Sequence, residues 1–365
     1  MSKHLLTLPR LRVQNANCIS SPMTWGFPAI TAFTGFMVAL QRRLMQKAGE
    51  ANALAASLRF ESVGVVCHRF EPQVTTGGYT RSFALTRNPV LQDGGTAAIV
   101  EEGRAHLDIS LVFTVHTAQG YVSDEDAQAA AEAVAAEVAG MRLAGGSIMP
   151  TLQKLRAPQR TPRMEVLKAE PEDQLKQFKQ LRRRLLPGFA LVTRDDVLQQ
   201  RLQTLQAEHA AQATTTSASA APTLLDAWLD LSRINHRAQS DEATGQVTWK
   251  QDARPGWLVP MPVGFATLSS YETGTVANAR DANTPFRFVE SVYSIGQWVS
   301  PHRLEIAEAF MWKPEYDPEL GLYRCVNGYR APDDKAPSAE ADMAAERGDS
   351  ENDTSSSNPN QLDFD

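Results

Sequence analysis

The segment AHLDISLVFTVH, residues Ala105–His116, is the clearest β-strand in the chain, and the rest of the fold is interpreted from it. Apolar and polar side chains alternate along it, so a strand would place them on opposite faces. The apolar face holds Leu107, Ile109, Leu111, Phe113 and Val115, and the polar face holds His106, Asp108, Ser110, Thr114 and His116. We therefore expect a sheet with one face buried by helices.

Helices and strands are predicted on both sides of this strand. Ser123 and Asp126 resemble a capping box at the start of a helix, and Ala127, Val134 and Met141 lie on its apolar stripe. The expected elements, in order, are strand Leu5–Gln14, helix Ala32–Gln46, strand Val63–Phe70, strand Ala105–His116, the helix after Ser123 and a short glycine-broken strand Met141–Ile148. The order β-α-β-β-α-β predicts an α+β, ferredoxin-like domain.

The remaining sequence extends this domain. Residues 72–104 contain turn signals at Gly77-Gly78 and Asp93-Gly94-Gly95 around the extended run Tyr79–Thr86, which predicts a protruding β-hairpin, or thumb. The pattern is helical over Pro171–His209, with a break at Pro187-Gly188, and again over Thr223–Arg237. The expected organisation is a ferredoxin-like domain at 1–150, a helical insertion at 151–245 with a flexible connector at 210–222, a segment at 246–330 that packs back on the core, and a disordered acidic tail at 331–365.

The net charge of −6 conceals an uneven distribution. Residues 331–365 carry −8, so residues 1–330 carry +2, and ten bases stand against four acids between Lys154 and Arg184. Clustered bases suit RNA, although a charge of +2 proves nothing by itself. Three widely spaced cysteines, Cys18, Cys67 and Cys325, favour neither a disulfide framework nor a zinc site, and no apolar run reaches membrane-spanning length. We expect a soluble, cytoplasmic protein without a cofactor or metal.

Several blocks of unusual composition occur in an order that closely resembles one family. The blocks are NANCISSPMTWGFPAITAFTGF (Asn15–Phe36), CHRFE (Cys67–Glu71), LTRNP (Leu85–Pro89), AAIVEEGRAHL (Ala97–Leu107), MRLAGGSI (Met141–Ile148), RRLLPGFALV (Arg183–Val192), PGWLVPMP (Pro255–Pro262) and FVESVYSIGQWVSPHR (Phe288–Arg303). The resemblance is to the RAMP-superfamily Csy subunit that holds the 5′ handle of the guide RNA in type I-F CRISPR surveillance complexes. It covers nearly everything from Leu5 to about Arg330.

The resemblance implies a noncatalytic RNA-binding subunit used in antiviral defence. Its expected partners are the guide RNA through the 5′ handle, the large subunit of the Csy complex and the adjacent backbone subunit, with no membrane contact and no homo-oligomer. Guide processing belongs to a separate subunit in that family. Two alternatives remain open: a RAMP-fold endoribonuclease that processes precursor RNA through His68 or His106, and a scaffold that binds only proteins.

Candidate RNA-binding residues fall in four places. Hydroxyl groups ahead of the first helix suit phosphate oxygens, and Gly26 and Gly35 allow close approach of the backbone. The alternative for this block is a packed loop that buries Trp25. The glycine step after Arg142 and the arginines before LLPGF also suit phosphate, although glycine pairs usually mark only a bend and a helix end favours cations in any case. The candidates are Ser20, Ser21, Thr24, Trp25, Arg69, Arg81, Arg87, Arg142, Gly145, Gly146, Arg182, Arg183 and Arg184.

The polar face of the predicted sheet has two interpretations. It presents Arg10, Arg12 and Gln14 from the first strand beside His106, Asp108 and Ser110 from the third, without the aromatic residues on which RNA-recognition modules stack bases. Either the face binds RNA through charge and backbone, or the later chain covers it. The apolar residues Trp298, Phe310, Met311 and Trp312 are candidates for a partner-facing surface.

Overall fold

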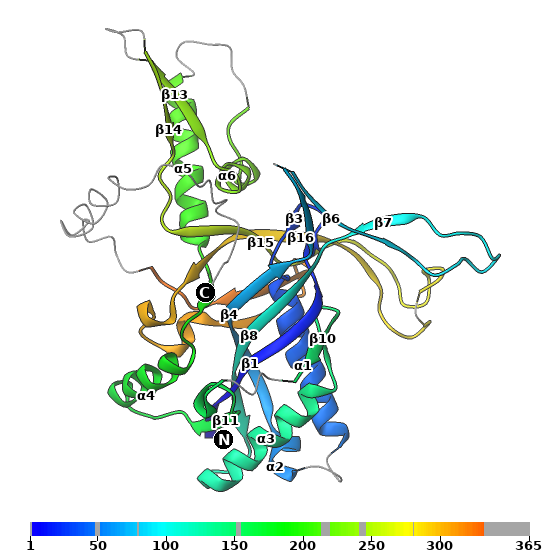
Figure 1. Ribbon diagram of the computed structural model, residues 1–365, viewed down its shortest axis with the longest axis vertical. Helices are drawn as coiled ribbons and strands as arrows, with labels where there is room; N and C mark the ends of the chain where they lie inside the picture. Colours follow the sequence, from blue (N-terminus) through cyan, green and yellow to red (C-terminus); the bar gives the residue numbers. More distant parts are fainter. Residues whose placement is uncertain are drawn as a thin grey trace.

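The computed structural model describes residues 2–47, 52–78, 80–150, 155–212, 220–240, 246–279 and 281–331. The tail from residue 332 onward and part of the connector at 210–222 lie outside this described chain, and so do the expectations made for them. The fold is built around one large antiparallel sheet (Figure 1).

The N-terminal half contains the strands and helices that the sequence pattern predicts. Its elements are β1 (Ser2–Asn17), α1 (Ile30–Gln46), β4 (Arg59–Pro72), β8 (Arg104–Thr117), α3 (Asp124–Ala139), β9 (Arg142–Leu143) and β10 (Gly146–Met149), together with the short α2 (Ala53–Ser57). The sheet order is β9-β10-β1-β8-β4, and every neighbouring pair is antiparallel. Ser123 caps α3 as expected, since its side chain accepts a hydrogen bond from the Asp126 backbone.

Helices α1 and α3 bury one face of this sheet. Phe33, Leu40 and Val134 pack against Ile109 and Leu111 in one continuous core. The opposite face is covered at its Leu5 end by α4 (Pro171–Arg184), whose Phe178 and Leu181 share a second core with Leu5, Val66 and Val112. The later chain therefore covers part of the polar face of the sheet, for which the sequence allowed either RNA binding or burial by the later chain.

The C-terminal half closes a ring of strands onto β4. Strand β12 (Phe189–Thr193) pairs with both β4 and β16 (Arg287–Val299). Pairing continues through β15 (Trp257–Ser270), β18 (Leu322–Asn327) and β17 (Met311–Asp317) and returns to β4. A buried hydrogen bond of 2.9 Å from Trp312 Nε1 to the Leu191 carbonyl joins β17 to β12, the two strands of the ring that pair with β4.

Two sequence expectations are wrong in this half. The helical pattern over Pro171–His209 contains the strand β12, because the apolar run Phe189–Val192 is stabilised by pairing with distant strands rather than by local helix contacts. The four residues proposed to face a partner are instead buried in the core, because ring closure turns them inward: Trp298, Phe310, Met311 and Trp312.

A separate lobe lies between β12 and β15. It comprises α5 (Asp195–Gln212), α6 (Leu224–Leu231) and the hairpin β13 (His236–Ser240) and β14 (Val247–Gln251) (Figure 1). Thr223 and Asp226 form a capping box at the start of α6. The helix expected over Thr223–Arg237 ends at Leu231, where Asn235 binds the Asp230 backbone carbonyl, and strand pairing begins at His236.

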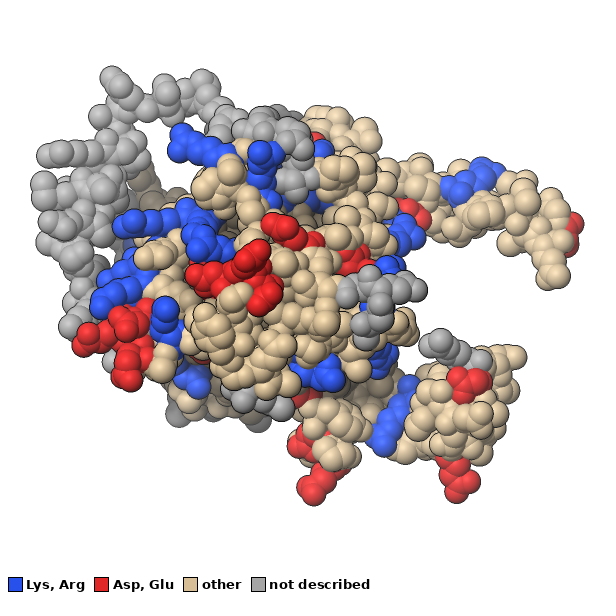
Figure 2. Space-filling view, turned by 90° about the horizontal axis from the view of Figure 1, so that it is seen from below, with Lys and Arg blue, Asp and Glu red and all other residues tan. Residues whose placement is uncertain are grey.

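Two arms project from the body, and the sequence predicted only one of them. The first arm comprises β5 (Val74–Gly77), β6 (Thr80–Arg87) and β7 (Ile99–Glu102), which correspond to the hairpin expected in residues 72–104. The second arm is formed by the outer halves of β15 and β16 with the loop between them. Figure 1 shows both arms extending to the same side, and Figure 2 shows open space between two projections.

Candidate nucleic-acid interface

The hydroxyl groups expected to meet phosphate instead hold a tight turn. Strands β2 (Ile19–Ser21) and β3 (Thr24–Trp25) flank this turn. Ser20 Oγ lies 2.8 Å and Ser21 Oγ 2.6 Å from Thr24 Oγ1, and Ser21 Oγ also accepts from the Thr24 backbone at 3.1 Å. The three hydroxyls are therefore engaged with one another.

Trp25 at the end of this turn is exposed, so the alternative in which the loop buries it is wrong. Its side chain is 52% exposed, and its ring meets Phe83 of the first arm edge-on with centroids 5.0 Å apart. Trp25 and Phe83 thus link the turn to the arm. An exposed indole held by a neighbouring ring is a platform on which an unpaired base can stack.

The open half of the sheet gathers arginines from three strands. Arg12 of β1 lies opposite Asp108 of β8, and Asp108 lies opposite Arg69 of β4. Arg142 of β9 reaches the same face because it lies opposite Ser147, which lies opposite Gln14. We call Arg12, Arg69 and Arg142 the arginine face. Sequence reasoning named Arg69 and Arg142 as sites but left Arg12 out of the candidate set.

Asp108 lies at the centre of the arginine face, and two opposing effects act on the pKa of its carboxyl group. Burial raises the pKa of its carboxyl above the ordinary value, while Arg10, Arg12 and Arg69 act to lower it. Arg10 Nη1 lies 3.4 Å from Asp108 Oδ2. Arg69 also pairs with Glu71 at 2.9 Å, but its side chain is 64% exposed and thus remains accessible to a phosphate.

Toward the covered half of the sheet, Arg10 and His68 are used structurally. The Pro187 carbonyl accepts from His68 Nδ1 at 2.5 Å and from Arg10 Nη2 at 3.4 Å. Ser110 Oγ lies 2.7 Å from His68 Nε2. Burial, reinforced by the Arg10 charge, lowers the pKa of His68 to about 3, so this imidazole is neutral at pH 7. His68 therefore has a structural role inside β4, where its ring is buried and hydrogen-bonded on both nitrogens.

The two neighbouring glycines after Arg142, Gly145 and Gly146, differ in the space around them. Gly145 has φ +76° with open space around it, whereas a Cβ on Gly146 would lie 2.6 Å from the Gln14 carbonyl oxygen. Gly146 is therefore required for packing of β10 against β1. A Cβ added at Gly26, which has φ +129°, or at Gly35 would meet no other chain atom within 4 Å, so the close approach expected there is not made by the chain itself.

The first arm carries the two remaining candidate arginines of the N-terminal half. Arg81 and Arg87 both lie on β6 and are exposed. Arg81 lies opposite Thr76 of β5, and Arg87 lies opposite Ile99 of β7. In Figure 2 basic and acidic side chains are interleaved over the face shown rather than gathered in one basic field. Electrostatic attraction of RNA would therefore depend on local groups such as the arginine face.

The arginine run at the end of α4 is divided among three roles. Arg182 Nη1 donates to the carbonyls of His302 and Leu304 at 2.9 and 3.0 Å, and Arg184 pairs with Glu165 at 3.6 Å. Arg183 is exposed beside a pocket of about 400 Å³ that Arg156 and Arg184 also line. Figure 1 places α4 on the other side of the body from the arms, so this run and the Trp25 region are not brought together.

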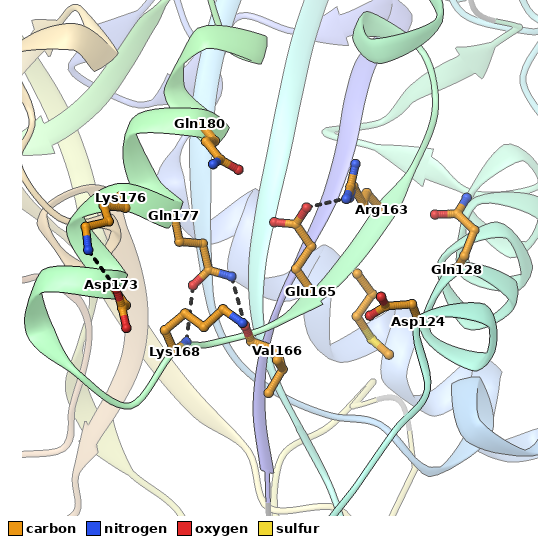
Figure 3. A pocket seen from close by; sticks show the side chains of 11 residues that line it. Asp124, Gln128, Arg163, Glu165, Val166, Lys168, Asp173, Lys176, Gln177 and Gln180 are labelled. Carbon is orange, nitrogen blue, oxygen red and sulfur yellow. Dashed lines mark hydrogen bonds and ion pairs between the residues drawn. The ribbon is translucent and has the colours of Figure 1, made fainter.

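A pocket of about 540 Å³ lies between the start of α3, β11 (Arg163–Val166) and α4 (Figure 3). Its lining holds three acids and three bases, and four of these six pair with one another: Arg163 with Glu165, and Lys176 with Asp173 at 3.0 Å. Gln177 Nε2 also donates to the Val166 carbonyl at 2.8 Å. The pocket thus presents acids and bases in equal number rather than the basic lining of a phosphate site.

The described chain shows little that suits catalysis. Among the residues placed in the structure, no group of three or more His, Cys, Asp or Glu side chains is arranged to hold a metal ion. Cys18, Cys67 and Cys325 are buried, and burial raises the pKa of Cys18 to about 12. His106 Nε2 contacts Gln73 at 3.0 Å, and His106 Nδ1 accepts from the Asn15 backbone at 3.4 Å. Over the same described ranges, no helix combines the length and apolar character needed to cross a membrane.

Comparison with known proteins identifies both a family and a relative of this chain. Residues 6–325 match the model of the family described as CRISPR-associated protein (Cas_Csy2). The chain is also 46% identical over 328 residues to the CRISPR-associated protein Csy2 of Pseudomonas aeruginosa (strain UCBPP-PA14), an alignment that covers 88% of this chain and 94% of that protein.

Proposed function

This chain belongs to the CRISPR-associated Csy2 family, subunits of the type I-F Csy complex, and from this membership we propose that it anchors the 5′ handle of the guide RNA without cutting it. The observation that carries the proposal is the arginine face, and an exposed stacking platform supports it. Arg12, Arg69 and Arg142 share one sheet face, while Trp25 is exposed against Phe83. Phosphate-binding guanidinium groups and an aromatic platform are the two components that single-stranded RNA requires.

The fold supports a second part of the proposal. We propose that β1-α1-β4-β8-α3-β10 is a ferredoxin-like domain of the RAMP type, with the first arm as its thumb. Its support is the strand order β10-β1-β8-β4, the antiparallel pairing throughout and the placement of α1 and α3 on one face. The partners proposed with it are the large subunit and the adjacent backbone subunit, and its location is the cytoplasm.

Titration of a fluorescent 5′-handle RNA tests the arginine face. The variant R12Q/R69Q/R142Q is compared with a charge-matched control in the α6–β14 lobe, R233Q/K250Q/R254Q. Loss of up to three phosphate contacts should weaken binding and reduce the slope of log K against log salt by about 2, because each contact to a single strand contributes about 0.7. Equal effects in the two variants, or none in either, would remove the arginine face from the site.

A further inference from the structure

A basic groove lies between the C-terminal end of α4 and the short 3₁₀ helix η1 (Ala157–Gln159). It has a volume of about 400 Å³, and among the described residues its lining holds three arginines, two glutamines and a proline but no acid. The arginines are Arg156, Arg183 and Arg184. The larger neighbouring pocket in Figure 3 has acids and bases in equal number. We call the basic site the α4 groove.

Two of the three arginines in the α4 groove are not engaged by the protein. Arg184 pairs with Glu165 at 3.6 Å. Among the residues that the structure places, no hydrogen bond or ion pair holds the side chains of Arg156 and Arg183, and both residues are exposed. The C-terminal end of a helix carries only about half a negative charge, which leaves most of the charge of these two guanidinium groups uncompensated. The α4 groove therefore suits an anionic ligand.

The described chain ends close to the α4 groove. Ala331 lines a cavity of about 1000 Å³ together with Arg303. Arg303 belongs to η2 (Pro301–Arg303), which contacts α4, and Arg182 binds the carbonyls of the residues on either side of Arg303. Tyr329 also packs against the core that α4 shares with the sheet. The next residues of the chain therefore begin beside the last turn of α4.

The tail that follows, residues 332–365, is strongly acidic. It holds ten acids and two bases, a net charge of −8, and it lies beyond the residues 6–325 that match the Csy2 family. A fully extended chain of 34 residues spans up to about 110 Å, several times the length of about 21 Å expected for the 14 residues of α4. The tail can therefore reach the α4 groove. A covalently attached ligand also has an effective concentration of about millimolar, which favours it over a free polyanion.

We propose that the acidic tail binds in the α4 groove of its own chain and keeps other polyanions, such as RNA that lacks the handle, out of this groove. Opposite charge and the start of the tail beside the groove both select this occupant, since carboxylates bind guanidinium groups through paired hydrogen bonds. The described lining of the groove has no aromatic ring on which an unpaired base could stack, so RNA would bind there only through its phosphates. The contact involves α4 rather than the arginine face and does not depend on handle binding.

Photocross-linking of the full chain tests the contact directly. Benzoylphenylalanine is introduced in place of Gln180, which lines the α4 groove and is exposed, and the cross-linked peptides are identified by mass spectrometry. We expect cross-links to residues 332–365 of the same chain, and their loss when the ten tail acids are replaced by Asn or Gln. The same photoreactive residue in place of Trp249, which is exposed on β14, is the control and should capture far less of the tail.

Binding of poly(U) RNA by the full chain tests the consequence. The neutral-tail variant should bind poly(U) about twofold to tenfold more tightly than wild type at low salt, because the free fraction of the groove rises from between about a tenth and a half to nearly one. In R156Q/R183Q, which changes two exposed side chains, neutralising the tail should lose most of this effect. The matched lobe variant R233Q/K250Q, also at exposed positions, should retain it in full.

Absence of tail cross-links from position 180, or cross-links only between two chains, would overturn the proposal. No gain in poly(U) affinity, or an equal gain in the R156Q/R183Q and R233Q/K250Q backgrounds, would also overturn it, because the tail would then act by general repulsion or not at all. Handle binding by wild type and by R12Q/R69Q/R142Q is measured separately. Failure of the proposed handle function would therefore leave each of these outcomes interpretable.

Discussion

At the scale of single residues, the turn before α1 shows how one block of sequence supports two different roles. Ser20, Ser21 and Thr24 are satisfied by one another, whereas Trp25 is half exposed. The serine–proline spacing indicates such a self-contained turn, because a hydroxyl readily accepts from a backbone amide two or three residues later. The exposure of Trp25 depends on its contact with Phe83 across 58 residues of chain, which local sequence does not encode.

Trp25 is the residue at which loss of stacking should be most evident. Trp25→Ala should weaken handle binding by about 1–3 kcal/mol, the contribution of one base stacked on an aromatic ring, while Trp25→Phe should retain most of the affinity. Fluorescence anisotropy at fixed salt measures both. Met23→Ala, which removes an equally exposed but nonaromatic neighbour, serves as the control. Unchanged affinity in Trp25→Ala would exclude stacking there.

At the scale of elements, a helix or strand is predictable from sequence when its hydrophobic pattern is long and has a clear period. Strand β8 and helices α1 and α3 are predictable because their alternation and helical stripes extend over many residues. Strand β12 has five residues and an apolar run without a distinguishing period, and its partner β16 lies about a hundred residues later. The arginine face likewise depends on strand register, which unites Arg12, Arg69 and Arg142 but leaves no local sequence signal.

The end of α4 gives a prediction that separates structure from binding. Arg182→Gln should lower the melting temperature, because it removes two hydrogen bonds to backbone carbonyls, each contributing about 1 kcal/mol or somewhat more with a charged donor. Arg183→Gln should leave the melting temperature unchanged. If α4 meets RNA, Arg183→Gln alone should reduce the salt slope of binding by about 0.7. A wild-type slope in Arg183→Gln would restrict this arginine run to a structural role.

At the scale of the whole molecule, Glu61 joins strands that are distant in sequence. It pairs with Lys3 of β1 at 3.3 Å, His116 of β8 at 2.9 Å and Lys313 of β17. Burial acts to raise its pKa, but hydrogen bonds from Lys313 and His116 and the charge of Lys3 prevail and lower it from 4.5 to about 2. The carboxylate therefore connects the N-terminal sheet to the strand ring.

This depressed pKa predicts a pH-dependent contribution to stability. The stabilisation is fully present above pH 4.5 and is lost as the pH falls toward 2, because the folded state then takes up a proton that the unfolded state has already bound. Glu61→Gln should cost about 2 kcal/mol at pH 7 after allowance for solvent screening. Thermal melts between pH 7 and pH 2.5 should show the gap between wild type and variant closing. A constant gap would exclude a titration at Glu61.

A further prediction for the whole molecule is that it binds RNA without cleaving it. RNA cleavage without metal requires a histidine that can exchange a proton beside the ribose 2′-hydroxyl. His68 is 3% exposed, has a pKa of about 3 and is held by Ser110 and Pro187, so it is neither accessible nor basic at pH 7. His106 is the accessible alternative, in contact with Gln73 on the open half of the sheet.

Incubation of the full chain with a repeat-containing precursor RNA, with and without Mg²⁺, should therefore give binding without site-specific cleavage. His106→Ala should still bind and should remain inert. His68→Ala should lower the melting temperature, because it removes two buried hydrogen bonds, one to the Pro187 carbonyl and one to the Ser110 hydroxyl. Cleavage at one position by wild type that disappears in His106→Ala would instead identify an endoribonuclease. The anchoring role would then require that the same open sheet face both holds the handle and cuts beside it.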